Sequence, residues 1–196
     1  MTTGSSPFAR RAAETFAAIA DNFRALDAHA GTVAAMAEAV TAALRAGNTI
    51  FFCGNGGSAA DSQHLAAELL GRYRLDRAPL PAVALTVDTS ALTAIGNDFG
   101  FDDIFARQLR GLGKRGDVLV ALTTSGNSPN VMKAVAAARE MGVTVLGFTG
   151  GSGGALKDAS DIALVVPASR TDRIQEMHIA CGHLICELVE ETLAAG

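Results

Sequence analysis

Five short apolar runs, separated by segments of helical periodicity, place the strongest constraint on how this chain can fold. None of the runs alternates apolar and polar residues, as a strand with one wet face would, so each is expected to be a strand buried on both faces. Helices between such strands predict right-handed crossovers and a parallel sheet. We therefore expect an α/β fold of the flavodoxin-like kind, a three-layer α/β/α sandwich around a five-stranded parallel sheet. The strands are expected at residues 49–53, 82–85, 118–122, 143–148 and 162–166.

Apolar side chains at helical spacing predict the helices that connect and follow these strands. Two further helices are expected before the first strand, within about residues 7–45, where Gly31 would end the first and Thr32 would cap the second. This pair has no evident place over the sheet, so we expect it to serve in oligomerisation. The chain shows no linker or repeat, and a single domain over residues 1–196 is expected. The other helices are expected at residues 59–70, 90–95, 104–112, 129–141 and 173–194.

Composition and charge exclude several classes of protein. With 49% hydrophobic and 18% charged residues, the chain is expected to be globular and not disordered. The formal net charge of -4 comes without a basic patch, so we expect no nucleic-acid partner. No apolar stretch approaches the ~18 residues of a membrane span, and no apolar signal segment opens the chain, so no membrane association is expected. The three cysteines, Cys53, Cys181 and Cys186, are too few and odd in number for a disulfide framework, which predicts a reducing, cytoplasmic location.

The first candidate binding loop is Cys53-Gly54-Asn55-Gly56-Gly57-Ser58, between a predicted strand and a predicted helix. Its glycines would let the backbone approach a ligand closely, and Ser58 would cap a helix whose N-terminus attracts anions. No lysine follows, so the loop is not a nucleotide P-loop, and its glycine spacing is not the dinucleotide fingerprint. Taken alone, the segment is equally compatible with a ligand site and with a tight strand-to-helix turn.

The second candidate loop, Thr123-Thr124-Ser125-Gly126-Asn127-Ser128-Pro129-Asn130, also follows a buried strand and opens a helix. Its hydroxyls and free N–H groups would meet at a positive helix end, which makes a phosphate cradle without a cation. An ordinary capped loop is the alternative. Because ligands of open α/β sheets bind at the carboxyl edge of the strands, two such loops favour a ligand that carries phosphate. A third glycine-rich segment, residues 147–154, is interpreted as a flexible connection.

A candidate metal site can be assembled from two of the predicted helices. His64 and Glu68 are four residues apart and share one helix face. Gln175 and His183 are eight residues apart on the closing helix, about 80° apart around its axis, and so lie on one side. Taken singly, the first two are more often a solvated pair and His183 a satisfied buried histidine. Together, two imidazoles, a carboxylate and an amide oxygen would suit zinc, provided that the two helices meet.

The segments CGNGGSAADSQHLAAE, GRYR, AIGNDFGFDDIF, TSGNS and DRIQEMHIACGH occur in this order. They resemble the phosphoheptose isomerase family, which has the SIS (sugar isomerase) fold, from about Thr49 to the C-terminus. TSGNS alone would indicate only an SIS domain, whereas DRIQE with a following histidine, together with HxxxE on the helix after the first strand, is more specific. The resemblance implies an aldose–ketose isomerase that interconverts sedoheptulose 7-phosphate and D-glycero-D-manno-heptose 7-phosphate through an enediol, the first step towards ADP-heptose. It also implies one zinc ion per subunit and a homotetramer with sites at subunit interfaces.

The resemblance further implies roles for individual residues, motif by motif. Glu68 and His183 would be the acid/base pair, and Asp172 would help to open the sugar ring. The chain departs from the family where the phosphate loop begins Thr-Thr in place of Ser-Thr, which keeps the hydroxyls. The zinc ligands would be His64, Glu68, Gln175 and His183. The substrate-binding residues would be Asn55, Gly56, Gly57, Ser58, Glu68, Arg72, Asn97, Asp98, Thr123, Thr124, Ser125, Ser128, Asp172 and Gln175.

A different class of protein is the alternative, namely a non-catalytic SIS-domain protein that binds a protein partner such as a replication initiator. Such relatives share the CGNG and RIQE segments but lack parts of the acid/base and metal set. This chain has His64, Glu68, Gln175 and His183 together, which favours the isomerase. A regulator that senses sugar phosphates would need a DNA-binding domain, for which the chain has no room.

Overall fold

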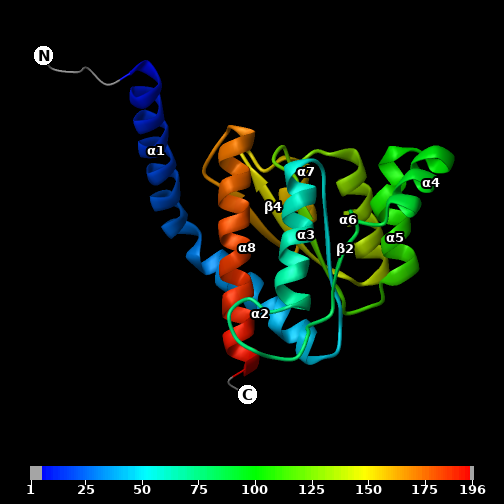
Figure 1. Ribbon diagram of the computed structural model, residues 1–196. Coiled ribbons are helices and arrows are strands. Elements are labelled where there is room, and N and C mark those ends of the chain that lie inside the picture. The colour runs from blue at the N-terminus through cyan, green and yellow to red at the C-terminus, as the bar shows by residue number, and fades with distance from the viewer. Residues whose placement is uncertain (1–5, 195–196) are drawn as a thin grey trace, which may run out of the picture.

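The computed structural model describes residues 6–194, and a sheet of five parallel strands lies at its centre (Figure 1). The strand order is β2-β1-β3-β4-β5, which is the order of flavodoxin-like folds. Phe51 of β1 lies beside Val83 of β2 on one side and beside Leu119 of β3 on the other. The expected α/β class and five-stranded parallel sheet are confirmed. The strands are β1 Ile50–Gly54, β2 Ala82–Ala84, β3 Val118–Leu122, β4 Thr144–Gly150 and β5 Ile162–Val166.

Helices cover both faces of this sheet and complete the three layers (Figure 1). Helices α2, α3 and α8 pack on one face, and α4, α5, α6 and α7 pack on the other. Helix α7 is additional to the helices expected from the sequence. Within residues 6–194, no helix combines the length and the hydropathy that a membrane span requires. The helices are α1 Pro7–Ala25, α2 Ala30–Arg45, α3 Gly57–Leu70, α4 Thr89–Phe99, α5 Ile104–Leu112, α6 Pro129–Met141, α7 Gly154–Ala159 and α8 Thr171–Ala194, with 3-10 turns at Leu26–His29 and Phe101–Asp103.

Burial on both faces explains why the strands are continuous apolar runs. In β1, Phe51 belongs to the core layer that α5 and α6 share, while Phe52 belongs to the layer that α2, α3 and α8 share. Both side chains are fully or almost fully buried, and each such burial contributes about 2–3 kcal/mol. The strands therefore have no polar face, and polar functional groups must come from the loops at their carboxyl ends and from the helices.

Helix α2 lies over the sheet, which corrects the expectation that the N-terminal pair would not. Val33, Met36, Val40 and Leu44 recur along one side of this helix and are buried in the same core layer as α8. Their spacing is that of a helix with one core-facing side. The sequence contains this apolar side, but only the fold shows that it faces the sheet of its own chain.

The break between the N-terminal helices also comes earlier than expected. Helix α1 ends at Ala25, a 3-10 turn follows, and α2 begins at Ala30. Gly31 therefore does not end a helix and Thr32 does not cap one, because both lie in the first turn of α2. The turn redirects the chain so that the apolar side of α2 reaches the sheet. That burial outweighs the ~1 kcal/mol by which a glycine disfavours a helix.

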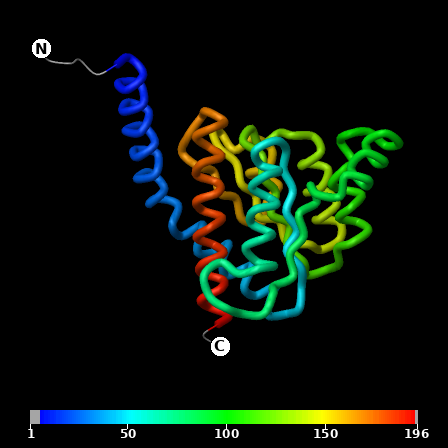
Figure 2. Tube along the Cα trace, in the orientation of Figure 1, coloured from blue at the N-terminus to red at the C-terminus, as the bar shows by residue number. Residues whose placement is uncertain are grey.

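Helix α1 stands apart from the sandwich, as both the ribbon and the Cα trace show (Figures 1 and 2). It contains no buried residue. Phe8 is 88% exposed and Phe16 is 69% exposed, and these two side chains lie on one side of the helix with Phe23. Of the two N-terminal helices, α1 is therefore the one that leaves an apolar side uncovered.

The buried histidine of α8 should make folding stability depend on pH. His178 is fully buried, its Nε2 lies 3.2 Å from the carbonyl oxygen of Thr149, and its ring meets Phe148 edge-on. Burial lowers the pKa of His178 from 6.5 to about 4. The unfolded chain therefore binds a proton between these two pH values that the folded chain does not. Stability should be fully present above about pH 6.5 and fall as the pH drops towards 4, by about 2 kcal/mol between pH 7.5 and 5.

Urea unfolding at the two pH values measures this effect. His178→Asn should lose most of the pH dependence, whereas His29→Asn, which changes a histidine outside the core, should keep it. A His178→Asn protein with the wild-type pH dependence would assign the effect to other groups.

Candidate active site

The first loop joins β1 to α3, and both its backbone conformation and its close contacts favour glycine. Gly56 has a φ of +56°, in the left-handed region, and α3 begins at Gly57. A Cβ on Gly57 would lie 2.7 Å from the side-chain amide of Gln175, so the start of α3 touches α8 at this point. Ser58 was expected to cap α3, but Gly56 occupies the N-cap position and Ser58 is the buried second residue of the helix.

The second loop joins β3 to α6 and brings three hydroxyl groups together. The Oγ1 of Thr123 lies 2.8 Å from the Oγ of Ser128 and 3.4 Å from the Oγ of Ser125. Ser128 is the N-cap of α6, and Pro129 occupies the first helical position, as expected. These hydroxyls therefore lie at the positive end of a helix, which is where a phosphate would be stabilised.

A pair of asparagines connects the two loops. The side-chain amides of Asn55 and Asn130 donate to each other's oxygen, at 2.8 Å in both directions. Asn130 lies in the first turn of α6 and is almost fully buried. The two loops thus lie side by side at the carboxyl ends of the strands, as expected from the parallel strand arrangement.

The third glycine-rich segment packs against the second loop. The interpretation of residues 147–154 as a flexible connection is therefore wrong. Its first half is part of β4, and its last residue begins α7. The backbone N–H of Ala155 donates to Asn127 Oδ1 at 3.0 Å, and that of Leu156 donates to the carbonyl oxygen of Gly126 at 2.9 Å. A Cβ on Gly154 would lie 2.5 Å from the carbonyl oxygen of Ser125. The glycines are required by this close packing and not by flexibility.

Helices α3 and α8 meet, which the sequence had left open, and this brings His64, Glu68 and His183 together. The Nε2 of His64 lies 3.1 Å from Glu68 Oε1 and 3.0 Å from the Nε2 of His183. Possible ligand atoms of the three residues all lie within 4.8 Å of one another. Gly182 was not singled out from the sequence, yet a Cβ there would lie 2.6 Å from Leu65 of α3. A small residue at this position lets α8 approach α3 closely enough to form the cluster.

This cluster offers nitrogen and oxygen ligands that suit a divalent metal ion. Two imidazoles and a carboxylate form a ligand set typical of catalytic zinc, which keeps a further position for substrate or water. The side chain of His64 is half exposed, so the cluster is open to a small molecule. Gln175 lies on the same side of α8, with its amide against Gly57, and its place among the ligands stays a prediction.

The remaining predicted site residues lie at the surface, and Arg72 lies at the end of α3 that is far from these loops. Asn97 and Asp98 are exposed at the end of α4, where their side chains form a 2.8 Å hydrogen bond with each other. Arg72 is exposed in the segment after α3. Asp172 accepts hydrogen bonds from Arg173 and Arg170, which lower its pKa to about 2. A carboxylate held ionised in this way can accept hydrogen bonds from a sugar but is a poor carrier of protons.

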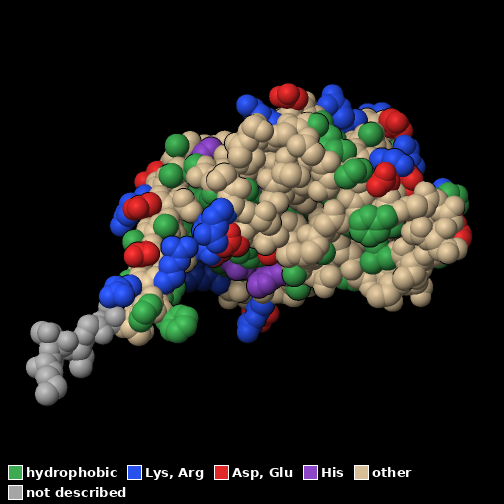
Figure 3. Space-filling model, turned by 90° about the horizontal axis from the view of Figure 1, so that it is seen from above, with side chains coloured by type: hydrophobic (Ala, Val, Ile, Leu, Met, Phe, Trp, Pro, Cys, Tyr) green, Lys and Arg blue, Asp and Glu red, His purple; other side chains and the backbone are tan. Residues whose placement is uncertain are grey.

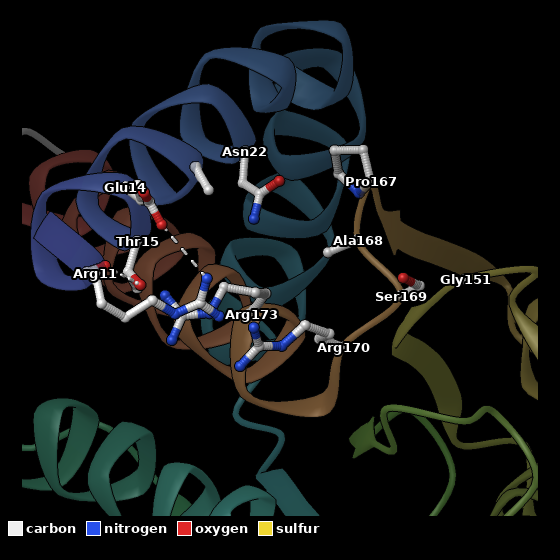
Figure 4. A pocket seen from close by; sticks show the side chains of 11 residues that line it. Arg11, Glu14, Thr15, Asn22, Gly151, Pro167, Ala168, Ser169, Arg170 and Arg173 are labelled. Carbon is white, nitrogen blue, oxygen red and sulfur yellow. Dashed lines mark hydrogen bonds and ion pairs between the residues drawn. The ribbon is translucent and has the colours of Figure 1, made fainter. Parts of the chain in front are cut away.

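A pocket of about 600 Å³, which the sequence did not indicate, lies between α1 and the segment that leads into α8 (Figure 4). The side chains of Arg11, Arg170 and Arg173 gather in it. Each of these arginines has a carboxylate within 4 Å, from Glu14, Asp172 or Glu176. The positive charges are thereby balanced, and the pocket does not offer the net charge expected of a phosphate site.

Proteins of known family match the chain over most of its length. A family model described as the SIS domain matches residues 14–150. The phosphoheptose isomerase of Akkermansia muciniphila is 57% identical over 178 residues, which are 91% of this chain and 94% of that protein. The phosphoheptose isomerase of Rhodospirillum rubrum is 59% identical over 176 residues, which are 90% and 94% of the two chains.

Solved structures that superpose on this chain point to the same family. The phosphoheptose isomerase of Neisseria gonorrhoeae superposes with a TM-score of 0.87 at 46% identity, over 94% of this chain and 99% of that chain. The phosphoheptose isomerase of Francisella tularensis superposes with a TM-score of 0.89 at 36% identity, over 95% and 100% of the two chains. The fold, the two glycine-rich loops and the His–Glu–His cluster are thus found in a chain that belongs to the phosphoheptose isomerase family of SIS-domain proteins.

Proposed function

We propose that this protein interconverts sedoheptulose 7-phosphate and D-glycero-D-manno-heptose 7-phosphate, an early step towards ADP-heptose. The observation that carries the proposal is the assembly of His64, Glu68 and His183 from two helices, beside a loop of converging hydroxyls. The relatives described above are named phosphoheptose isomerases, which supports this reaction. A non-catalytic SIS protein that binds a partner would have no need for this cluster, and we therefore set that alternative aside.

The reaction moves a proton between C1 and C2 of the sugar through a cis-enediol. One group must remove a carbon-bound proton, and another must exchange protons with the sugar oxygens. We assign the first task to Glu68 and the second to His183, because these two side chains come from different helices and their polar atoms lie within 4.8 Å of each other. Glu68 and His183 are far apart in the sequence, and the packing of α3 against α8 brings them together.

We further propose that His64, Glu68, Gln175 and His183 hold one zinc ion per subunit. A bound zinc would polarise the ketose carbonyl and stabilise the negative charge of the enediolate. The two imidazoles and the carboxylate of the cluster support this ligand set.

In the same proposal the phosphate binds to the second loop, through Thr123, Thr124, Ser125 and Ser128, with assistance from Ser58. Ser128→Ala is expected to raise the KM for sedoheptulose 7-phosphate about tenfold and to change kcat less, because a hydrogen bond to a charged group contributes about 1.5–3 kcal/mol. Steady-state kinetics measure both constants. Ser90→Ala removes an exposed hydroxyl from α4 and is the control. An unchanged KM in Ser128→Ala and in Ser125→Ala would place the phosphate elsewhere.

The sugar itself would be met by Asn55, Gly56 and Gly57 at the first loop. Asn97, Asp98 and Arg72 are assigned to the sugar by the family motifs, with Asp172 as an acceptor of hydroxyl hydrogen bonds. Because Asn97, Asp98 and Arg72 are exposed, we propose that a neighbouring subunit completes the site around them. This is the arrangement that the family resemblance implies.

We expect a homotetramer, assembled in part through α1. Hydrophobic side chains lie exposed along this projecting helix (Figure 3), among them Phe8 and Phe16. Burial of such a side chain in an interface would stabilise the assembly by about 2 kcal/mol. Light scattering should give the mass of four chains for the wild type and a smaller mass for Phe8→Glu/Phe16→Glu. A stable wild-type monomer at micromolar concentration would contradict the expectation.

We place the protein in the cytoplasm. Its three cysteines are free and buried, and burial raises the pKa of Cys53 and Cys186 to about 12 and that of Cys181 to about 11. Such thiols are unreactive and make no disulfide framework, which is typical of a reducing compartment.

The direct test of the proposed function uses the purified, zinc-loaded protein. Incubation with sedoheptulose 7-phosphate should produce the aldose until the two sugars reach equilibrium, as followed by chromatography or NMR. If a folded, metal-loaded protein forms no aldose, the proposed reaction is wrong.

A further inference from the structure

A buried ion pair connects α8, which carries His183, to the segment that follows α3. The Nε of Arg77 lies 3.0 Å from the Oε2 of Glu190, and the two side chains are 9% and 1% exposed. Arg77 belongs to the segment between α3 and β2, and Glu190 lies in the last turns of α8. In the Cα trace, this segment passes close to the end of α8 (Figure 2), and the ion pair shows that the two are in contact.

Glu190 holds the segment after α3 by its backbone as well as by Arg77. Its carboxylate accepts from the N–H groups of Tyr73, Arg74 and Leu75, at 2.9, 2.6 and 2.7 Å. Burial by itself would raise the pKa of Glu190, but these hydrogen bonds and the charge of Arg77 outweigh it and lower that pKa. The carboxylate therefore stays ionised, and it fixes three consecutive residues of the segment against α8.

Arg77 holds the end of α3. Its guanidinium donates to the carbonyl oxygens of Glu68 and Leu69, both at 2.9 Å, and to that of Ala78 at 3.0 Å. The last carbonyl groups of a helix lack partners within the helix, so Arg77 satisfies two of them. One of these carbonyls belongs to Glu68, a member of the cluster.

The position of Tyr73 follows from this arrangement. Its ring lies against that of His183, with 5.8 Å between the centroids and 40° between the planes. The ring of His64 lies 4.8 Å from that of His183. His183 is only partly buried, so its imidazole could otherwise turn towards solvent. Packed against both rings, it keeps its Nε2 within 3.0 Å of His64.

We propose that Tyr73, held in place by the buried Arg77–Glu190 pair, is a positioning residue that orients the imidazole of His183 towards His64 and Glu68. Its effect on turnover rests on the proposed function of His183. Its effect on the His183 ring does not.

The first experiment compares Tyr73→Leu with Tyr73→Phe. Tyr73 is partly exposed, so neither change should prevent folding. Tyr73→Leu is expected to lower kcat about tenfold with little change in KM, because the loss of a correctly oriented group affects the chemical step more than binding. Tyr73→Phe keeps the ring and should retain kcat within about twofold of wild type.

Imidazole NMR of histidine-labelled protein supplies a reading that a general loss of stability would not give. The contact between the His183 and His64 rings, detected as nuclear Overhauser effects between their ring protons, should weaken in Tyr73→Leu and remain close to wild type in Tyr73→Phe. His29, which lies in the turn between α1 and α2, serves as the internal control.

The second experiment tests the ion pair with Glu190→Gln and uses Glu191→Gln, an exposed neighbour, as the matched control. Glu190→Gln should reproduce the lower kcat and the weakened His183–His64 contact of Tyr73→Leu. Tyr73 is the chain's single tyrosine and there is no tryptophan, so fluorescence excited in the tyrosine absorption band reports on this residue alone. That emission should change in Glu190→Gln and not in Glu191→Gln.

A Tyr73→Leu protein with wild-type kcat would overturn the proposal whenever the wild type is active. If the wild type does not convert sedoheptulose 7-phosphate, the proposed function fails, and the His183–His64 contact then decides the positioning role alone. An unchanged His183–His64 contact in Tyr73→Leu would overturn it in that case too.

Discussion

Replacing Glu68 by glutamine is expected to lower the turnover of sedoheptulose 7-phosphate by a factor on the order of 10² or more. The substitution keeps the size and the hydrogen-bonding capacity of the side chain but removes the group assigned to take the carbon-bound proton. The affinity for the sugar phosphate should stay near that of the wild type, because the phosphate would be held by the separate loop around Thr123 and Ser128. Calorimetric binding and steady-state kinetics on the same preparation measure the two effects.

The control for this prediction is Glu140→Gln, which removes an exposed carboxylate from α6 and should leave turnover unchanged. Metal content should be measured on each variant, since Glu68 is assigned both as a ligand and as a base. Loss of turnover with retained zinc would support the base role, and loss of both would assign the effect to the ion. Near wild-type turnover in Glu68→Gln would contradict the assigned chemistry.

Wild-type protein in D₂O provides a second reading of the same mechanism. An enediol route exchanges the carbon-bound proton with a protein group, so deuterium should enter recovered sugar at the carbon beside the carbonyl. Glu68→Gln should slow this exchange together with turnover.

Replacing His64 by alanine is expected to reduce bound zinc from about one ion per chain to a small fraction of that. His64 contributes one of two imidazoles in a cluster whose ligand atoms lie within 4.8 Å of one another, and its loss leaves too few ligands for tight binding. Elemental analysis after mild purification measures the zinc. In the bound state, X-ray absorption should report nitrogen and oxygen ligands near ~2.1 Å.

His29→Ala is the matched control, because His29 lies outside the cluster in the turn before α2. It should retain the zinc of the wild type. Equal zinc in wild type and His64→Ala would refute the proposed ligand set, whatever the activity of the two proteins.

The N-terminal helices show where local pattern stops being informative. The apolar side of α2, with Val33, Met36 and Val40, can be read in the sequence, but its partner cannot. The structure buries this side against the sheet of its own chain and leaves α1 without a buried residue. Both helices have an apolar side, and only the path of the chain through the turn at Leu26–His29 distinguishes the one that reaches the core.

The third glycine-rich segment makes the same point for loops. Glycines are compatible with flexibility and with close packing, and the sequence of residues 147–154 does not separate the two. The contact between Gly154 and the carbonyl of Ser125 decides in favour of packing, because a side chain would not fit there. The loop assigned to phosphate is therefore supported by residues 147–154, for which the sequence had indicated no role.

By itself, the sequence determined the features that depend on neighbouring residues. Burial on both faces is visible in uninterrupted apolar runs such as 118–122, and helix starts are visible in turn residues such as Pro129. The five strands and the crossover helices other than the short α7 could therefore be predicted. His64 and Glu68 could be placed on one face because four residues make about one helical turn. The tertiary structure alone decided how close α8 comes to α3, through Gly182, and how the segment after α3 is held. Arg77 and Glu190 are 113 residues apart, and no periodicity in the chain relates them. Their pairing depends on the satisfaction of two buried charges in the folded molecule, which is a property of three-dimensional packing.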